Sequence, residues 1–384
     1  MEMVLEYPND YQDWDKLTEH CQVVEGLTEF EKVKCRQAFE LLKKELGETF
    51  LKEVSDTKHP IQGYVANTAP WTRRWFIWFA EAINDLRRHG NFDKLLSRLK
   101  DPEKFGEGLS VLDVGHKFSK VGFKLAFDHC ADVSGHPKIP DIQVLDVEAN
   151  EEFYIEVSIL GDSDVQTTAM ETLNGITQVF WNSIPFLQYS GRIHKVLSKN
   201  HLIEIRGRVS EAVSRVSTDG GFRELIIAGV LELGMASEAG KELLEKWVAE
   251  RGLTVGQMTG PSINVDEVFR VKRKIEAKQR QLPTDKPNVV VVMSNGVFWG
   301  GADIAEKINH LEEAVYEYPH LLCAVVSGRY MGVGENKTIM KDQHVYIVKP
   351  RADLQVEQHL ILLNKYCGHK VYPRTITKIY NSFH

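Results

Sequence analysis

The chain has 384 residues, of which 43% are hydrophobic and 26% charged, and its formal net charge is −7. This composition suits a globular protein with a large core, and the acidic balance counts against a protein that coats nucleic acid through basic residues. No apolar run reaches the roughly 18 residues of a membrane helix, and the start MEMVLEYPND lacks a leader-like pattern, so we expect neither membrane insertion nor secretion. The five cysteines are widely spaced and odd in number, which favours a reducing cytoplasm over a disulfide framework.

Residues 1–105 are expected to be helical. Thr28 and Glu31 have the spacing of a capping box, which predicts a helix from Thr28 to about Gly47. A later segment places three tryptophans on one helix face, namely Trp71, Trp75 and Trp78. Packing between helices is the simpler interpretation of this face, and stacking on nucleic-acid bases or contact with another subunit is the alternative.

From about residue 106 the pattern changes to helix, three strands and helix. Apolar residues at helical spacing end at Gly122, and alternating apolar residues then predict strands. The expected strands are 123–127, 140–147 and 153–160, followed by a helix over 165–181.

Residues 191–384 are expected to form further α/β structure that extends the sheet of the preceding segment. Helices are predicted over 202–217, 265–281 and 302–318, and strands within 224–233 and over 288–293, 321–327 and 344–350. Pro, Ser and Gly accumulate near 183–192 and 254–264, which are candidate linkers. The predicted organisation is therefore 1–105, 106–190 and 191–384.

Two carboxylates carry the most specific chemical signal. Asp141 begins one predicted strand and Glu156 lies within the next, with a tight turn between the strands. In an antiparallel pair the two side chains can emerge on one face and converge. Two ionised carboxylates at close range require a cation, and hard oxygen ligands favour Mg²⁺ or Mn²⁺. The alternative interpretation is a pair of solvated surface residues.

The segment PKIPDIQVLDVEANEEFYIEVS resembles the PD-(D/E)XK nuclease superfamily, also called restriction-endonuclease-like. Pro140 and Asp141 match the first half of its motif, and Glu156-Val157-Ser158 match the second half except at the last position. The resemblance covers about 75 residues. It implies a metal held by Asp141, Glu156 and the Val157 carbonyl, with Glu107 on the preceding helix as a further ligand.

Ser158 stands where the superfamily usually has a lysine that activates water and stabilises developing charge. A serine is neutral and short, so three outcomes stay open: a cation from elsewhere in the chain, catalysis by the metal alone, or an inactive site. Helix 165–181 has no lysine or arginine but offers Gln178. Other candidates are Lys138 and the basic helix 265–281. Lys138 and, on that helix, Lys274 and Lys278 are also predicted to contact nucleic acid; the alternative interpretation of the helix is a solvated face. The cluster Asp128 to Asp132 with His136 lacks a recognised zinc spacing.

The sequence therefore predicts a mixed α/β protein with a restriction-endonuclease-like core sheet flanked by helices and a helical N-terminal region. The expected activity is Mg²⁺- or Mn²⁺-dependent hydrolysis of nucleic-acid phosphodiester bonds, with DNA as the first choice. The alternative is a catalytically inactive module of the same fold that binds nucleic acid or protein. A cytoplasmic protein, acting as a homodimer or within a larger complex, fits these expectations.

Overall fold

The computed structural model describes residues 9–120, 122–133, 136–146, 151–181, 186–263, 266–294, 304–334, 337–348 and 380–383. The chain divides into two compact units. The first contains Met1–Leu160 and Glu267–His384, and the second contains Gly161–Asp266, so the second is inserted into the first. This division differs from the predicted segments 1–105, 106–190 and 191–384. The reason is that strands on either side of the insertion pair directly in one sheet.

The N-terminal region of the first unit is helical, as predicted. A 3₁₀ turn precedes α1, and seven helices follow one another: η1 (Asn9–Gln12), α1 (Trp14–His20), α2 (Glu29–Leu46), α3 (Phe50–Asp56), α4 (Ile61–Ala66), α5 (Pro70–Leu86), α6 (Phe92–Lys100) and α7 (Phe105–Lys120). The predicted capping box is confirmed, because Thr28 Oγ1 accepts from the backbone N–H of Glu31 while the Glu31 carboxylate accepts from the N–H of Thr28.

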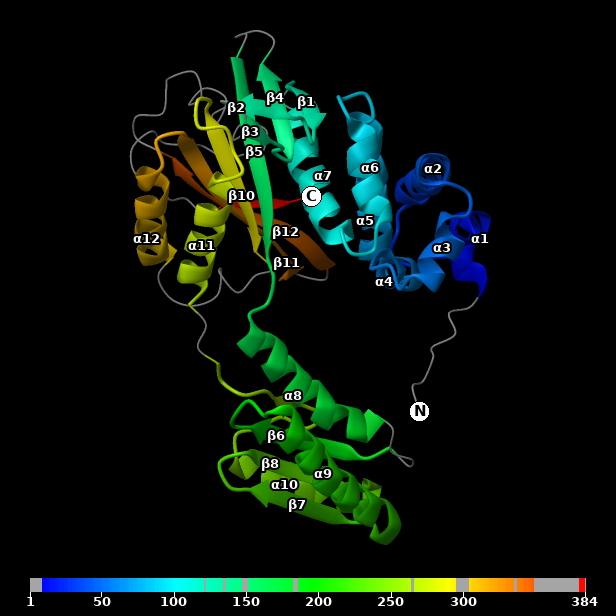
Figure 1. Cartoon of the computed structure of the whole chain (residues 1–384). Helices are drawn as coiled ribbons and strands as arrows, with labels where there is room; N and C mark the ends of the chain where they lie inside the picture. The colour runs from blue at the N-terminus through cyan, green and yellow to red at the C-terminus, as the bar shows by residue number, and fades with distance from the viewer. Residues whose placement is uncertain are drawn as a thin grey trace. The chain divides into compact units, whose positions relative to one another are not determined.

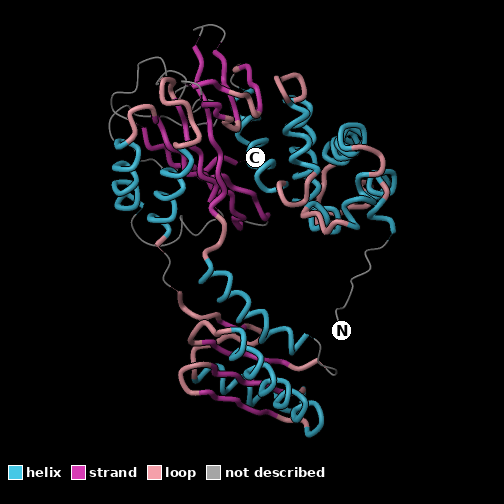
Figure 2. Tube along the Cα trace, viewed as in Figure 1, coloured by secondary structure: helices cyan, strands magenta, loops and turns pink. Residues whose placement is uncertain are grey.

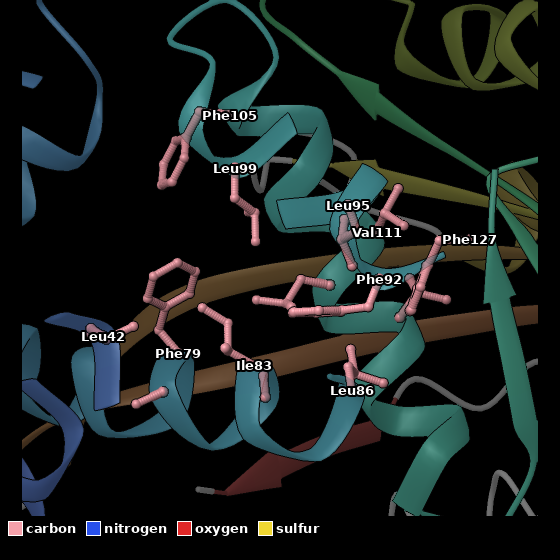
Figure 3. Close-up of a cluster of buried hydrophobic side chains, with 14 of the residues drawn as sticks. Leu42, Phe79, Ile83, Leu86, Phe92, Leu95, Leu99, Phe105, Val111 and Phe127 are labelled. Carbon is pink, nitrogen blue, oxygen red and sulfur yellow. The ribbon is translucent and has the colours of Figure 1, made fainter. Parts of the chain in front are cut away.

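On α5, Trp71 is exposed, whereas Trp75 and Trp78 pack against the core of the first unit. Trp75 stacks on Tyr64 with ring centroids 4.0 Å apart and on Phe79 at 4.9 Å. The packing interpretation of this face is therefore confirmed for Trp75 and Trp78. Figure 3 shows the neighbouring core, where Phe79 and Ile83 of α5 meet the apolar side chains of α6 and α7.

The first unit contains a seven-stranded mixed sheet in the order β1-β4-β5-β10-β11-β12-β13. Its strands are β1 (Lys124–Phe127), β4 (Ile142–Asp146), β5 (Glu151–Leu160), β10 (Asn288–Ser294), β11 (Leu321–Gly334), β12 (Lys337–Val348) and β13 (Tyr380–Phe383). β10 is parallel to both β5 and β11, and the other pairs are antiparallel. A separate hairpin joins β2 (Ala131–Val133) to β3 (His136–Lys138). The predicted continuation of the sheet into the C-terminal half is thus present.

Helices cover the two faces of this sheet, and the alternation along β5 separates two cores. Phe153, Ile155 and Val157 belong to the core shared with the N-terminal helices. Tyr154 and Leu160, on the other face, pack with α11 (Glu267–Gln279) and α12 (Ile304–Glu317). Figure 1 shows α7 on one side of the sheet and α11 and α12 on the other. Even-numbered residues of β5 therefore face α11.

The second unit pairs three helices with a four-stranded sheet in the order β7-β8-β6-β9. Its elements are α8 (Asp164–Trp181), β6 (Gln188–Ile193), α9 (Lys199–Asp219), β7 (Phe222–Ile227), β8 (Leu231–Ala236), η2 (Glu238–Gly240), α10 (Lys241–Glu250) and β9 (Met258–Thr259). Figure 2 shows these helices and strands along the chain.

Three predictions for the second unit need correction. The helix expected over 165–181 does form, but Ile176 and Phe180 bury their side chains in the core of the second unit rather than in the nuclease-like core. The expected linker 183–192 contains β6, and the single strand expected within 224–233 is the β7–β8 hairpin. These errors arise because apolar periodicity identifies an element without identifying the core that it joins.

The fold is mixed α/β, as predicted, with helices flanking the central sheet of the first unit. Among the described residues, no helix combines the length and the apolar character that crossing a bilayer requires.

Candidate functional site

Asp141, immediately before β4, and Glu156, on the adjacent strand β5, lie side by side. The strand pairing ends at Ile142 opposite Ile155, so Asp141 is placed across from Glu156 by continuation of the same register. Both carboxylates are buried: the exposed fraction is 7% for Asp141 and 3% for Glu156. The predicted convergence of these two side chains is present, and the alternative of a solvated surface pair is wrong.

Beyond the last residue pair of the β4–β5 ladder, side-chain oxygens accept hydrogen bonds from backbone N–H groups. Asp141 Oδ2 accepts from the N–H of Val157 at 2.8 Å, and Glu156 Oε2 accepts from the N–H of Asp141 at 3.2 Å. Each carboxylate is therefore oriented by a backbone donor of the opposite strand. Such fixed geometry keeps the two carboxyl groups close without letting either side chain rotate into solvent.

Glu156 is stabilised in its protonated form. Burial, followed by the neighbouring charge of Asp141, raises its pKa to about 7, whereas Lys278 opposes this rise. An acid with a raised pKa beside a second carboxylate is a feature that functional sites share with structural ion-pair networks. A cation added at this position would favour ionisation of both carboxylates.

Lys278 supplies a cation at this position from 122 positions further along the chain. Its ammonium donates to Glu156 Oε1 at 2.7 Å and to Gln281 Oε1 at 3.0 Å. Lys278 lies in the last turn of α11, and the apolar face of that helix buries Val271 and Ile275 against the sheet. Packing of α11 on the even-numbered face of β5 thus brings the ammonium over the carboxylates.

Arg98 supplies a second cation from the opposite direction. Its Nη1 donates to Asp141 Oδ1 at 2.7 Å, and its Nη2 donates to Asp128 Oδ1. Burial opposes the charge on Arg98, but Asp141, Asp128 and Glu107 together raise its pKa. α6 brings Arg98 to this position because it packs closely against α7 at Gly108, where an added Cβ would lie 3.1 Å from Arg98 Cβ.

Asp128 forms the turn after β1 in the left-handed region, with a φ of 47°. Its N–H donates to the Asp141 carbonyl at 3.1 Å, and its own carbonyl accepts from Lys94 Nζ at 3.0 Å. Burial raises the pKa of Asp128, against the effect of Arg98. Sequence reasoning missed Arg98, which belongs to no recognisable motif, and it considered Asp128 only within the cluster Asp128 to Asp132, which was set aside because it lacks a zinc spacing.

Ser158 is buried on β5, two residues beyond Glu156 and therefore on the same face of the strand. The ammonium of Lys278 is thus held over the face to which Ser158 belongs. Gln178, predicted as a substitute, is exposed on α8 in the second unit, whereas the residues gathered here belong to the first unit.

The remaining predicted residues lie around this centre. Glu107 is exposed rather than buried beside Val111, although its charge acts on Arg98. Lys138 donates to the carbonyl of Arg280 just beyond α11, so it ties the β2–β3 hairpin to the end of that helix. Lys274 is half-buried on α11, one turn before Lys278.

The carboxylate and carbonyl oxygens of this site are the kind of ligand that a small divalent cation binds. The N–H and C=O of an extended residue point to the same side of a strand, so the Val157 carbonyl faces the side on which its N–H meets Asp141. Among the described residues, no group of three or more His, Cys, Asp or Glu side chains is arranged to hold a metal. Mg²⁺ in proteins is commonly held by only one or two carboxylates, with water and phosphate as further ligands.

Neither the models of known protein families nor the curated proteins contain a match to the chain.

Proposed function

We propose that the first unit is a metal-dependent nuclease that hydrolyses phosphodiester bonds of nucleic acid, with DNA as the substrate. Asp141 and Glu156 would hold Mg²⁺ or Mn²⁺, and the Val157 carbonyl would complete the protein ligands. The observation that carries this proposal is the Lys278 ammonium, 2.7 Å from Glu156 on the face that also bears Ser158. It is a cation from elsewhere in the chain, beside Glu156 and over the strand face on which the resemblance leads us to expect a lysine.

Each residue then has a definite task. The bound metal would polarise the scissile phosphate and lower the pKa of a bound water. Lys278 would donate a hydrogen bond to the attacking water or to a phosphate oxygen, and so stabilise the charge that develops there. Arg98 would hold Asp141 in orientation while its second nitrogen stays on Asp128.

The alternative function is an inactive module of the same fold that binds nucleic acid or protein. The same contacts also favour the inactive module, because Arg98 and Lys278 already neutralise Asp141 and Glu156. A site with two buried ion pairs is electrostatically complete without a metal.

The test separates the two functions. Full-length protein is titrated with Mn²⁺ and Mg²⁺ by calorimetry and assayed on labelled single- and double-stranded DNA, beside Lys278→Met and the matched control Lys274→Met one turn earlier. We expect Lys278→Met to lower the cleavage rate about 100-fold or more while metal binding persists, because one donor to developing charge is lost. At saturating DNA, Lys274→Met should cleave at the wild-type rate; if Lys274 contacts nucleic acid, as its sequence predicts, only the DNA concentration needed for half-maximal cleavage should rise.

Asp141→Ala and Glu156→Ala should each abolish metal binding. If the wild-type protein binds neither metal, even with DNA present, the nuclease proposal is wrong. DNA binding that is unaffected by a chelator would then support the inactive module.

A further inference from the structure

Two buried cysteines meet in the N-terminal helical region, far from the carboxylate site in sequence. Cys21 follows the last residue of α1, and Cys35 lies in the middle of α2. Their Sγ atoms are 2.8 Å apart, and neither side chain has any exposed surface. Sequence spacing alone does not single out this pair, because the two cysteines are 14 positions apart and fit no redox or zinc motif.

A buried cation lies in the same core as the two sulfurs, and its charge acts on both of them. Arg73 of α5 is completely buried, and none of its three guanidinium nitrogens has a hydrogen-bond partner among the described residues. Its guanidinium carbon lies 5.7 Å from the ring centroid of Phe39 and 5.9 Å from that of Phe76. An isolated guanidinium in such surroundings is strongly destabilised unless an anion lies nearby.

The acidic groups that act on Arg73 are Cys35, Cys21 and Tyr11, and no carboxylate of the described chain is among them. A thiolate is therefore the anion that the surroundings of Arg73 favour. The hydrogen bond with Cys35 lowers the pKa of Cys21 against the effect of burial, and the charges of Arg73 and Arg36 lower it further, whereas the same contact and burial raise the pKa of Cys35. Position makes the pair unequal as well: Cys21, at the end of the short helix α1, is the sulfur suited to attack, and Cys35, within the longer helix α2, the one suited to resolve.

We propose that Cys21 and Cys35 form an oxidation site, a dithiol that a peroxide converts into a disulfide joining the end of α1 to α2. The Cys21 thiolate attacks one peroxide oxygen and the O–O bond breaks, which yields a sulfenic acid and, after protonation, water or an alcohol. The Cys35 sulfur then attacks the Cys21 sulfur, the S–O bond breaks, and the hydroxide leaves with the Cys35 proton as water. The two sulfurs are oxidised together by two electrons and the peroxide is reduced.

Distance favours a disulfide over a metal as the partner of these sulfurs. A tetrahedral zinc site with bonds of about 2.3 Å separates two sulfurs by about 3.7 Å, which is wider than the observed contact. A disulfide requires about 2.04 Å, so the sulfurs need to approach by less than 1 Å. The dithiol geometry is therefore close to that of the oxidised product.

The position of Cys21 supplies a route for the oxidant. α1 has seven residues, and the segment after it is exposed, with Val23 at 69%. Local opening of so short a helix uncovers Cys21 without unfolding α2 or α5. Oxidation removes the thiolate charge that stabilises Arg73. Because this destabilises the oxidised state, we expect the disulfide to be readily reduced.

The experiment treats the full-length protein with hydrogen peroxide at pH 7 and measures the state of each cysteine peptide by mass spectrometry after alkylation. The exposed thiol of Cys130 serves as the internal control. We expect the Cys21 and Cys35 peptides to lose two hydrogen atoms as a linked pair before Cys130 is oxidised. In Cys35→Ser, Cys21 should be trapped as a sulfenic acid that a 1,3-dione labels.

Arg73→Met should slow the oxidation about tenfold and move the midpoint of its pH–rate profile upward, because the thiolate loses its counter-charge. Circular dichroism checks that this variant folds. The wild-type result stands independently: if Cys21 and Cys35 remain alkylatable in the unfolded protein after Cys130 has been oxidised, the proposal is overturned. An unchanged pH–rate profile in folded Arg73→Met would overturn the role of Arg73.

Discussion

Replacement of Glu156 by glutamine should make the protein more stable above neutral pH. In the folded chain the pKa of Glu156 is raised from its ordinary value of 4.5 to about 7, chiefly by burial and then by Asp141. The folded state therefore binds more protons than the unfolded state between these two values. The stability that this group contributes is fully present below pH 4.5 and is lost as the pH rises through 7. Glutamine resembles the protonated acid and does not titrate.

The size of the effect follows from the same values. A difference of about 2.5 pH units corresponds to about 3.4 kcal/mol, which is the most that Glu156→Gln should gain over the wild type at pH 8. Because the residue is coupled to Asp141 and Lys278, we expect about 2–3 kcal/mol. In a unit of this size, that gain would raise the melting temperature by about 5 °C.

The assay is thermal unfolding by calorimetry at pH 5, 6, 7 and 8 in the presence of a chelator. Glu152→Gln is the matched control on the same strand: the pKa of Glu152 is lowered, against the effect of burial, by Tyr154 and Gln143, so its replacement should bring no gain at pH 8. Added Mg²⁺ should stabilise the wild type at pH 8 but not Glu156→Gln. Parallel stability curves for Glu156→Gln and the wild type would refute the argument that Glu156 is held protonated.

Three further predictions concern stability elsewhere. Arg98→Met should cost about 3 kcal/mol in urea unfolding, because the buried Asp141 and the half-buried Asp128 lose their shared cation. Arg98→Lys should recover only part of this, since an ammonium lacks the planar fork that bridges the two carboxylates. Thr28→Ala should cost about 1 kcal/mol through loss of the capping box, measured in the same way. Gly191→Ala would place a Cβ 2.4 Å from the Glu232 carbonyl oxygen, so we expect it to lower the free energy of unfolding of the second unit by about 1–3 kcal/mol. Calorimetry should then show the transition of the second unit at a lower temperature and that of the first unit unchanged.

Local patterns in the sequence were sufficient for half of the candidate site. The alternation along residues 153–160 and the short turn before it predict that Asp141 and Glu156 share one sheet face, and β4 and β5 pair in that way. Such a prediction succeeds because strand period and hairpin register are local properties.

The cations around the carboxylates could not be predicted in the same way. Lys278 was one of several basic residues on its helix, and only the packing of α11 on β5 distinguishes it from Lys274. Arg98 reaches Asp141 across 43 positions of sequence through the close crossing of α6 and α7. Both contacts depend on tertiary packing between distant elements, which leaves no periodic trace in the sequence.

The insertion of the second unit between β5 and α11 has a consequence for folding. Glu156 and Lys278 make contact across 122 positions, so a nascent chain cannot complete the site until residue 278 has been synthesised. Closing so long a loop of unstructured chain carries a large entropic cost, which falls when the intervening segment is already compact. Early collapse of residues 161–266 would therefore speed assembly of the carboxylate–lysine pair, and substitutions that slow folding of the inserted unit should delay the appearance of the site.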